Sequence, residues 1–286
     1  MEMRATRGWG YRRISRALSL SHGIDVPKGT VQNWILGTHN PSRRLHRYFE
    51  PTSSPELSYI IGIVLGDGYT AEDQGRGIIG LTNKDRNLLE YFLLCIARVF
   101  NCLSAGRITK GTRYGTLKAT VGSTLLMLFL QKPLAQLAPF IEKNPAHFIR
   151  GFFDVEGCAV VTTSGERLRV GVKASNSDIE VLQYISKLLR EKFHLASNIN
   201  VERRPWQTTI RGQVVEFKKT VFRLQVNKFS HVEVFSREIG FSSVSKQKIL
   251  EDALAILRRV RGKKAVDYWL RDYVKAGFRW SRIKAS

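Results

Sequence analysis

The amino-acid sequence predicts an α+β protein in which a small αββαββα domain occurs twice. Two nine-residue segments, 60–68 and 149–157, share one plan: apolar residues with a glycine third, an acid eighth and a glycine last. The same order of strand-like and helix-like patterns follows each segment. The repeat of about ninety residues is too long for a solenoid and indicates a duplicated domain. With 286 residues and a net charge of +22, the chain has room for one or two domains and the charge of a protein that binds a polyanion.

The charge narrows the classes of partner. Basic residues occur in every segment rather than in one tail, so a folded basic surface is expected, and nucleic acid is its usual partner. A membrane-surface or ribosomal role is the alternative. The three cysteines, Cys95, Cys102 and Cys158, lack metal-ligand spacing and indicate reduced thiols in a cytoplasmic protein. No signal peptide or membrane-spanning segment opens the chain, so an intracellular protein with access to DNA and no membrane partner is expected.

Residues 1–50 are predicted to form a separate all-α unit. Residues 11–20 and 28–36 have helical patterns around a glycine-containing turn, which is the plan of a helix-turn-helix. The unit carries nine Lys and Arg against three Asp and Glu. By resemblance to helix-turn-helix DNA-binding domains, residues 28–36 would be the recognition helix, and Gln32 and Asn33 would contact base edges. A helical packing module that reads no bases is the alternative.

The two copies of the repeated domain are expected at residues 51–145 and 146–250, after a polar linker with several prolines. In the first copy the predicted strands, helix and hairpin are residues 69–71, 77–82, 85–99, 107–110 and 116–121. In the second copy the corresponding elements are residues 158–163, 168–175, 178–193, 201–209 and 214–226. Helical patterns close both copies. Residues 251–286 are expected to form a basic helical extension with helices at 254–260 and 265–274. The sequence does not decide whether this extension contacts DNA or supports the core.

The two motifs are expected to be short helices that pack side by side. Gly62 and Gly66 are four residues apart and lie on one helical face, where the lack of a side chain lets a second backbone approach closely. If the helices are parallel, Asp67 and Glu156 emerge at the same end. Two carboxylates brought that close need a cation between them, so the pair predicts a divalent-metal site. Asp154 points to a different face of its helix and is expected to be structural.

This matched pair resembles the motifs of the LAGLIDADG homing endonucleases, and the likeness covers roughly residues 57–250. The resemblance implies a monomeric enzyme whose two subdomains form a saddle over double-stranded DNA. It implies that Asp67 and Glu156 bind Mg²⁺, or another divalent cation, and that both strands of a long asymmetric site are cut to leave short 3′ overhangs. A catalytically inactive DNA-binding regulator or an intron-splicing maturase on the same fold is the alternative. The chain ends lack the residues of a self-splicing intein, so a free-standing enzyme is expected.

The resemblance also suggests residues that assist catalysis. Asn83 and Asn176 occupy equivalent places after the second strand of each copy, where a polar residue of the family positions the attacking water. Both could equally cap the helix that follows. A lysine usually completes such a site, and Lys143 and Lys246 lie in the corresponding segments.

The strands of the second copy indicate DNA binding independently. Along residues 167–174 and 219–227, apolar residues alternate with basic or amide residues, so the apolar set should face the core and the polar set one sheet surface. Arg pairs with guanine and Gln or Asn with adenine in the major groove, and Lys and Arg also neutralise phosphates. A merely solvated face would mix in Asp and Glu, which the polar set of these two stretches lacks. The expected DNA-contacting residues are Arg167, Arg169, Lys173, Lys219, Arg223, Gln225 and Asn227, with Arg107 and Lys118 in the first copy.

Overall fold

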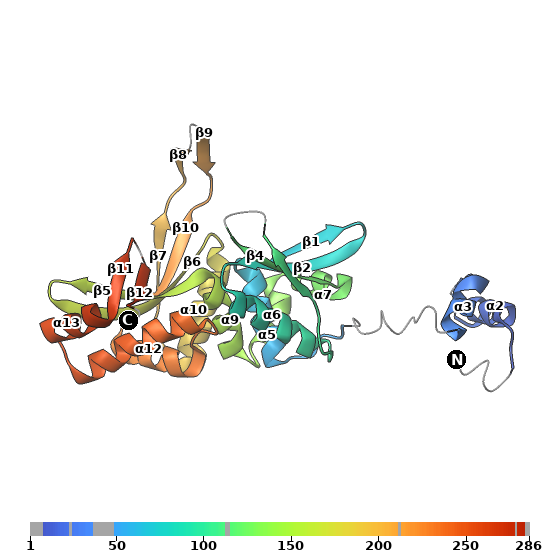
Figure 1. Ribbon diagram of the computed structural model, residues 1–286, viewed down its shortest axis with the longest axis horizontal. Coiled ribbons are helices and arrows are strands. Elements are labelled where there is room, and N and C mark those ends of the chain that lie inside the picture. Colours follow the sequence, from blue (N-terminus) through green and yellow to red (C-terminus); the bar gives the residue numbers. More distant parts are fainter. Residues whose placement is uncertain are drawn as a thin grey trace. The chain divides into compact units, whose positions relative to one another are not determined.

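The computed structural model describes residues 8–22, 25–36, 49–111, 115–210, 213–277 and 279–283. The chain divides into two units, residues 1–48 and 49–286 (Figure 1). The turn expected near residue 23 and most of the expected linker lie outside the described residues. The expected domain boundaries therefore stay predictions.

The first unit contains two helices, α2 (Tyr11–His22) and α3 (Lys28–Ile35). They close over a small core of Ile14, Val26 and Val31, against which the partly buried aromatic side chains of the unit pack. The Ser15 hydroxyl donates to the carbonyl oxygen of Val26 at 2.6 Å, which ties α2 to the segment before α3. The two expected helices are therefore present, and the helix-turn-helix assignment stays a prediction.

The second unit is built around two parallel helices, α5 (Pro55–Leu65) and α9 (Pro145–Glu156). Helix α5 starts where the Ser54 hydroxyl accepts from the backbone N–H of Leu57, with Pro55 at the first helical position, where its missing N–H has no cost. Its residues from Leu57 to Ile63 are all buried. This confirms the expected apolar core helix in the first motif.

In the first subdomain, a four-stranded antiparallel sheet of order β1-β2-β4-β3 follows α5. Its elements are β1 (Tyr69–Asp73), β2 (Arg76–Asn83), α6 (Arg86–Val99), β3 (Arg107–Lys110), β4 (Leu117–Gly122), α7 (Thr124–Leu130) and α8 (Leu134–Ile141). Ile79, Leu81, Ala119 and Val121 are buried on one face of this sheet. The predicted order of elements is confirmed.

The second subdomain repeats this plan with sheet order β5-β6-β10-β7. Its elements are β5 (Gly157–Ser164), β6 (Arg167–Asn176), α10 (Ile179–Phe193), β7 (Asn198–Arg203), β10 (Val221–Val226), α11 (Phe229–Val234) and the π-helix η1 (Phe235–Ile239). The hairpin expected at 201–209 and 214–226 is interrupted. Its outer part forms a separate two-stranded ribbon, β8 (Trp206–Ile210) and β9 (Gln213–Phe217). Pro205, which has no N–H for a strand ladder, stands at the break.

The C-terminal extension packs against the second subdomain. It consists of α12 (Val244–Arg259), α13 (Lys263–Asp272) and the hairpin of β11 (Tyr273–Ala276) and β12 (Arg279–Arg282). The helix expected at 265–274 therefore ends earlier, because the chain turns into this hairpin. Trp269 is fully buried and stacks on Tyr273 with ring centroids 4.0 Å apart. Trp280 Nε1 donates to the carbonyl oxygen of Val161 in edge strand β5 at 2.8 Å, so the extension supports the core and covers a sheet edge.

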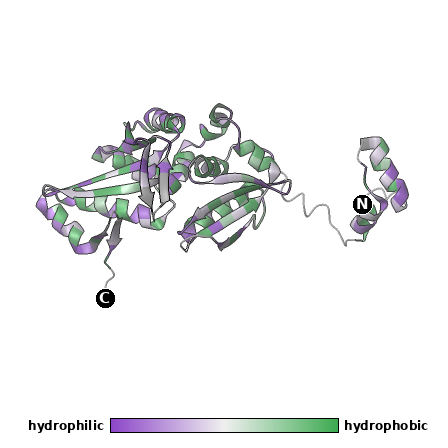
Figure 2. Cartoon of the chain, turned by 90° about the horizontal axis from the view of Figure 1, so that it is seen from above, coloured by the Kyte–Doolittle hydropathy of each residue, from purple (hydrophilic) through white to green (hydrophobic). Residues whose placement is uncertain are grey.

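The helices α6, α9, α10 and α12 contact one face of the two sheets, and in Figure 1 they lie below the strands. Seen from above, hydrophilic and hydrophobic residues alternate along the strands (Figure 2). Among the described residues no single helix is long and apolar enough to cross a membrane; α7 and α8 pass such a test only together and are bent by 103° at their break. Because these helices cover one face of the sheets, the other face of each sheet is the one that presents polar side chains.

Candidate active site and nucleic-acid interface

Glycines form the contact between α5 and α9. A Cβ atom on Gly62 would lie 2.8 Å from the backbone nitrogen of Phe152, and one on Gly151 would lie 3.3 Å from that of Ile63. Real Cβ atoms do not approach backbone atoms as closely as the first of these distances, so position 62 has no room for a larger residue. Both helices run in the same direction past this contact. The close parallel packing predicted from the glycine spacing is confirmed.

The two motif acids emerge together where the helices end. A Cβ atom on Gly66 would lie 3.0 Å from the Cγ atom of Glu156, which places this side chain directly against the end of α5. Asp67, the next residue, is exposed. Asn176 Nδ2 donates to Glu156 Oε1 at 2.8 Å. The helix pair therefore delivers one carboxylate from each half of the unit to one place.

The two carboxylates influence each other electrostatically. Burial raises the pKa of Glu156, the negative charge of Asp67 raises it further, and the result is about 7 although Asn176 and Lys246 act in the opposite direction. Burial also raises the pKa of Asp67, and Lys246 partly offsets this. Paired carboxylates that repel each other form an all-oxygen donor set, which fits a hard divalent cation such as Mg²⁺.

We expect the metal-free protein to lose stability as pH rises, because of Glu156. Its pKa is raised from 4.5 to about 7 in the folded state, so its contribution is fully present below about pH 4.5 and is lost as the pH rises through about 7. Glu156→Gln should remove this dependence and stabilise the metal-free protein at about pH 8 by about 1–2 kcal/mol, after allowance for solvent screening. Urea unfolding in EDTA at several pH values measures both effects. Parallel pH profiles of the variant and the wild type would contradict the assignment.

Lys246 is the lysine that reaches this site. It lies in the first turn of α12, and its Nζ donates to the carbonyl oxygens of Asp154 at 2.6 Å and Gly157 at 2.7 Å. Burial lowers its pKa, and the charge of Asp67 is among the influences that raise it. Its donors are thus directed at the C-terminal end of α9, where a positive charge is favourable. Lys246 positions the end of α9 rather than facing outward.

The expectation for Lys143 is wrong. This exposed residue lies before the first residue of α9, whereas Glu156 is the last residue of the same helix. At about 1.5 Å per residue, the helix separates its two ends by about 17 Å. Only Lys246 of the two candidate lysines is close to the acids. Segment position in the sequence could not separate them, because helix direction decides which end each residue occupies.

Asn83 and Asn176 stand in equivalent turns just before α6 and α10 but are not themselves the caps of these helices. The side-chain oxygen of Asn83 accepts a hydrogen bond from the backbone N–H of Asp85 at 3.0 Å, and that of Asn176 accepts one from the N–H of Asp178 at 2.8 Å. These aspartates in turn cap α6 and α10. The amide nitrogen of Asn176 is left to hold Glu156. The turn therefore orients both asparagines at the strand ends, and in the second half it directs Asn176 toward Glu156.

Asp154 is a structural residue, as its place on another helix face predicted. It is 1% exposed and accepts from the Tyr59 hydroxyl at 2.8 Å and from the backbone N–H of Ser242 at 2.9 Å. A third bond comes from the N–H of Ser243 at 3.4 Å. Asp154 therefore joins α5, α9 and the start of α12, which fixes the frame on which the two motif acids stand.

The predicted alternation along β6 and β10 is confirmed. Leu168, Val170, Val172, Ala174, Leu224 and Val226 are buried, and the intervening polar residues lie on the opposite face. Lys173 stands opposite Gln225, and Arg223 stands opposite Ser175. Arg167 and Arg169 are exposed farther along β6. Lys219 lies in the connection before β10 and Asn227 just after it, so neither belongs to the strand rows.

The face also contains an acid, which lies on a strand outside residues 167–174 and 219–227. Glu202 of β7 lies beside Lys173 and Arg223 and forms ion pairs with both. Asn198 and Asn200, which pair with Gln225 and Arg223, are further polar residues on the same strand. Sequence reasoning missed Asn198 and Asn200 because it began this strand at residue 201. It missed Glu202 because the pairing of β7 with β10 is not visible in the sequence. The alternation of polar and apolar residues from 198 to 203 was the signal that could have found them.

The first sheet presents a smaller polar face. Arg107 stands opposite Thr120, and Lys118 stands opposite both Thr82 and Thr109. The Lys118 Nζ lies 5.2 Å from the centre of the Tyr69 ring, within the range of a cation–π contact. Lys118 in this sheet and Arg223 in the second occupy corresponding register positions, each level with the motif acid of its own half.

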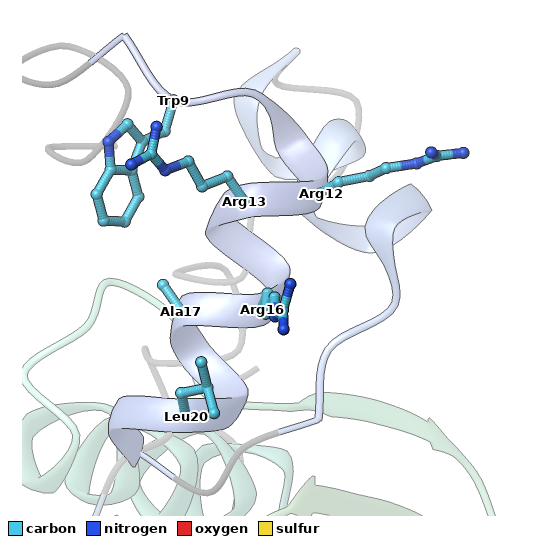
Figure 3. Close-up of a pocket in the computed structure, with 6 residues that line it drawn as sticks. All are labelled: Trp9, Arg12, Arg13, Arg16, Ala17 and Leu20. Atoms are coloured by element: carbon cyan, nitrogen blue, oxygen red, sulfur yellow. The ribbon is translucent and has the colours of Figure 1, made fainter.

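The basic face of the N-terminal unit lies on α2. An open groove of about 520 Å³ is lined by Trp9, Arg12, Arg13, Arg16, Ala17 and Leu20 (Figure 3). The Arg13 guanidinium lies 4.7 Å from the centre of the Trp9 ring, and α2 contains no acid. On α3, Asn33 is exposed and Gln32 half-buried. The positive charge of the described part of this unit is thus concentrated on a different helix from the expected recognition helix.

The fold and the site define a class of proteins built from a duplicated αββαββα domain, in which each motif helix ends in an acid. The family model described as the LAGLIDADG-like domain matches residues 54–129 and 143–240. The chain belongs to this family. The two matched segments correspond to the two subdomains, so the resemblance in the sequence is confirmed.

Two curated relatives come from Methanocaldococcus jannaschii. One is an uncharacterized protein that is 26% identical over 251 residues, which are 87% of this chain and 89% of that protein. The other is glutamine–fructose-6-phosphate aminotransferase [isomerizing], 26% identical over 230 residues; the match covers 75% of this chain but 18% of that enzyme.

Solved structures with a similar arrangement include I-DmoI in complex with DNA and Mn, with a TM-score of 0.47 and 18% identity over 66% of this chain and 98% of that one. The LAGLIDADG meganuclease I-AabMI bound to uncleaved DNA has a TM-score of 0.43 and 13% identity; the match covers 74% of this chain and 96% of that one. Full-length DUF199/WhiA from Thermotoga maritima has a TM-score of 0.46 and 18% identity; the match covers 77% of this chain and 67% of that one.

Proposed function

We propose that this chain is a divalent-metal-dependent endonuclease that cuts both strands of a long, asymmetric site in double-stranded DNA. The observation that carries the proposal is the pair Asp67 and Glu156, brought together at the end of two glycine-packed helices. A binding protein gains nothing from two adjacent carboxylates when burial, together with the charge of Asp67, raises the pKa of Glu156 to about 7. Two adjacent carboxylates at the surface, the second of them partly buried, are what a metal-dependent hydrolase requires.

Residues of this chain would divide the work as follows. Asp67 and Glu156 hold the cation, which when bound would activate water and stabilise the leaving oxygen of a phosphodiester. Asn176 keeps Glu156 in place, and Lys246 holds the helix end and balances part of the negative charge. Lys118 and Arg223, level with the acids, would contact the bound DNA, and Lys118 would neutralise a phosphate.

Binding would take place on the polar faces of the two sheets. A single chain supplies both acids and both sheets, so we propose that it acts as a monomer. The two faces differ in sequence at corresponding positions, for example Lys118 against Arg223 and Thr82 against Ser175. A site read by unequal halves is asymmetric, which suits a homing endonuclease that acts on one intron-insertion locus. Its substrate would place it inside the cell.

The test is cleavage of a randomised duplex DNA library with Mg²⁺ and then with EDTA. We expect a subset of sequences to be cut on both strands with Mg²⁺ and none with EDTA. A binding-only regulator or a maturase would instead enrich sequences without cutting them under either condition. That result would overturn the nuclease assignment.

We further expect α2 to contact DNA beyond the saddle. Replacing Arg12 and Arg16 by glutamine should shorten the DNA footprint at one end and reduce the slope of log affinity against log salt by about two units, since each phosphate contact contributes about 0.9. Footprinting and salt titration in EDTA measure the two effects. The double replacement of Arg86 and Arg98, which pair with Glu90 and Glu56, removes the same charge and should leave the footprint unchanged. An unchanged footprint in the α2 variant would mean that this helix serves something other than DNA.

A further inference from the structure

Glu202 is an acid on a surface that is otherwise basic. Its Oε1 atom accepts from Arg223 Nη2 at 2.6 Å and lies 3.5 Å from Lys173 Nζ. The three side chains come from different strands, β7, β10 and β6, and are 21%, 35% and 33% exposed. One carboxylate thus engages the two central cations of the second sheet. A negative charge there opposes phosphate binding, so its presence needs a reason.

Stability alone is a weak reason. Ion pairs exposed to this degree contribute little to the free energy of unfolding, typically about 0–1 kcal/mol. Burial by itself would raise the pKa of Glu202, but hydrogen bonds from Ser175 and Arg223 and the charges of Lys173 and Arg223 outweigh it, so its pKa is lowered. The carboxylate is therefore negatively charged at neutral pH, as its ion pairs with both partners require.

The pair Glu202–Arg223 stands beside the active site. Arg223 is opposite Ser175 on one side and Asn200 on the other, in the row of residues level with Glu156. Its Nε is buried and has no acceptor within the described part of the chain, so the protein satisfies this guanidinium on one side only. Glu202 is thus the acceptor that fixes the orientation of this guanidinium within the described residues.

The first sheet lacks this arrangement. The residue that corresponds to Arg223 is Lys118, and its neighbours across the strands are Thr82 and Thr109. Lys118 lies over the Tyr69 ring, and no ion pair to it occurs within the described residues. A lysine without an ion pair carries a compact charge on a flexible chain, whereas an arginine held by a carboxylate presents planar donors in a fixed orientation. The two halves therefore offer DNA different chemistry at equivalent positions.

We propose that Glu202 determines base specificity in the second half of the binding surface by holding Arg223 in a fixed orientation, in which it reads a guanine instead of a phosphate. This inference rests on the proposed DNA binding. Guanine presents two acceptors in the major groove, which match the fork of an oriented guanidinium. Glu202 also withdraws Lys173 from indiscriminate phosphate contact. Some general affinity is thereby exchanged for discrimination.

The experiment compares wild type with Glu202→Gln in EDTA, so that binding is separated from cleavage. One probe is a single duplex of arbitrary sequence, titrated at several salt concentrations, and the other is a randomised duplex library, from which bound sequences are selected and read. We expect the variant to bind the arbitrary duplex about three- to tenfold more tightly at low salt, with a salt slope steeper by about one unit. The guanine enrichment at one position should fall about tenfold.

Three further variants make the interpretation specific. Glu202→Asp keeps the charge but shortens the side chain, so it should retain the wild-type salt slope and still lose guanine enrichment. Glu233→Gln breaks the ion pair of Glu233 with Arg258 between α11 and α12 and makes the same charge change, and it should alter neither readout. In an Arg223→Gln background, Glu202→Gln should cause no further loss of guanine enrichment.

The inference is overturned if Glu202→Gln keeps the wild-type guanine enrichment, or if Glu233→Gln reproduces its effects. Thermal unfolding of each variant shows whether it is folded, and the aspartate variant tests orientation even if the glutamine variant is unstable. Wild-type binding that enriches sequences but yields no Mg²⁺-dependent cutting would overturn only the nuclease. A wild-type chain that enriches no sequence would overturn this inference as well.

Discussion

Replacing Asp67 by asparagine or Glu156 by glutamine is expected to abolish double-strand cleavage while DNA binding is retained or strengthened. Each substitution removes a carboxylate that would hold the metal, and cleavage should fall at least about a thousandfold, the scale on which loss of a catalytic group acts. Each also removes a negative charge that faces phosphate, so affinity should hold or rise. Cleavage of the selected DNA with Mg²⁺ and binding in EDTA measure the two effects separately.

The matched control is Asp73→Asn, which removes an exposed acid of β1 in the same unit. It should cut at the wild-type rate. Normal cleavage by the Asp67 or Glu156 variant would contradict the assignment of these two residues as metal ligands. Loss of binding together with cleavage would show instead that these acids hold α5 and α9 together.

Gly62→Val is expected to destabilise the unit by at least about 3 kcal/mol and to remove cleavage as well. A Cβ atom at position 62 would lie 2.8 Å from the backbone nitrogen of Phe152, and backbone atoms of a packed helix have no rotamer by which to move away. The helices must therefore separate, which leaves a poorly packed interface and moves Asp67 away from Glu156. Urea unfolding and the Mg²⁺-dependent cleavage assay measure the two losses.

Two further glycines make the result specific. Gly66→Ala should cost less, because the atoms nearest to its added Cβ belong to the side chains of Val155 and Glu156, which can rotate. Gly29→Ala places a methyl group in open space on α3 and should be neutral or slightly stabilising. If Gly62→Val is as stable as wild type, the close approach of the two helices does not hold the unit together.

The sequence determined the features that depend on local spacing. The third-position glycines and eighth-position acids of the two motifs predict a close parallel helix pair with Asp67 and Glu156 at one end, because helical periodicity alone fixes those faces. The alternation along residues 167–174 likewise predicts which side chains leave the core. The repeated order of elements predicts the duplicated fold. All of these patterns lie within one element or recur at one separation.

Only the tertiary structure decided which residues from distant segments meet. Glu202 joins Lys173 and Arg223 because β7 pairs with β10 in a particular register after a ribbon that Pro205 sets apart. Lys246 binds the end of α9 that carries Glu156 and Lys143 lies at the opposite end, because α9 runs with its C-terminal end at the site. Trp280 covers the edge of β5 from more than a hundred residues away. Strand register and helix direction arise from packing of the whole unit, so no local pattern in the sequence carries them.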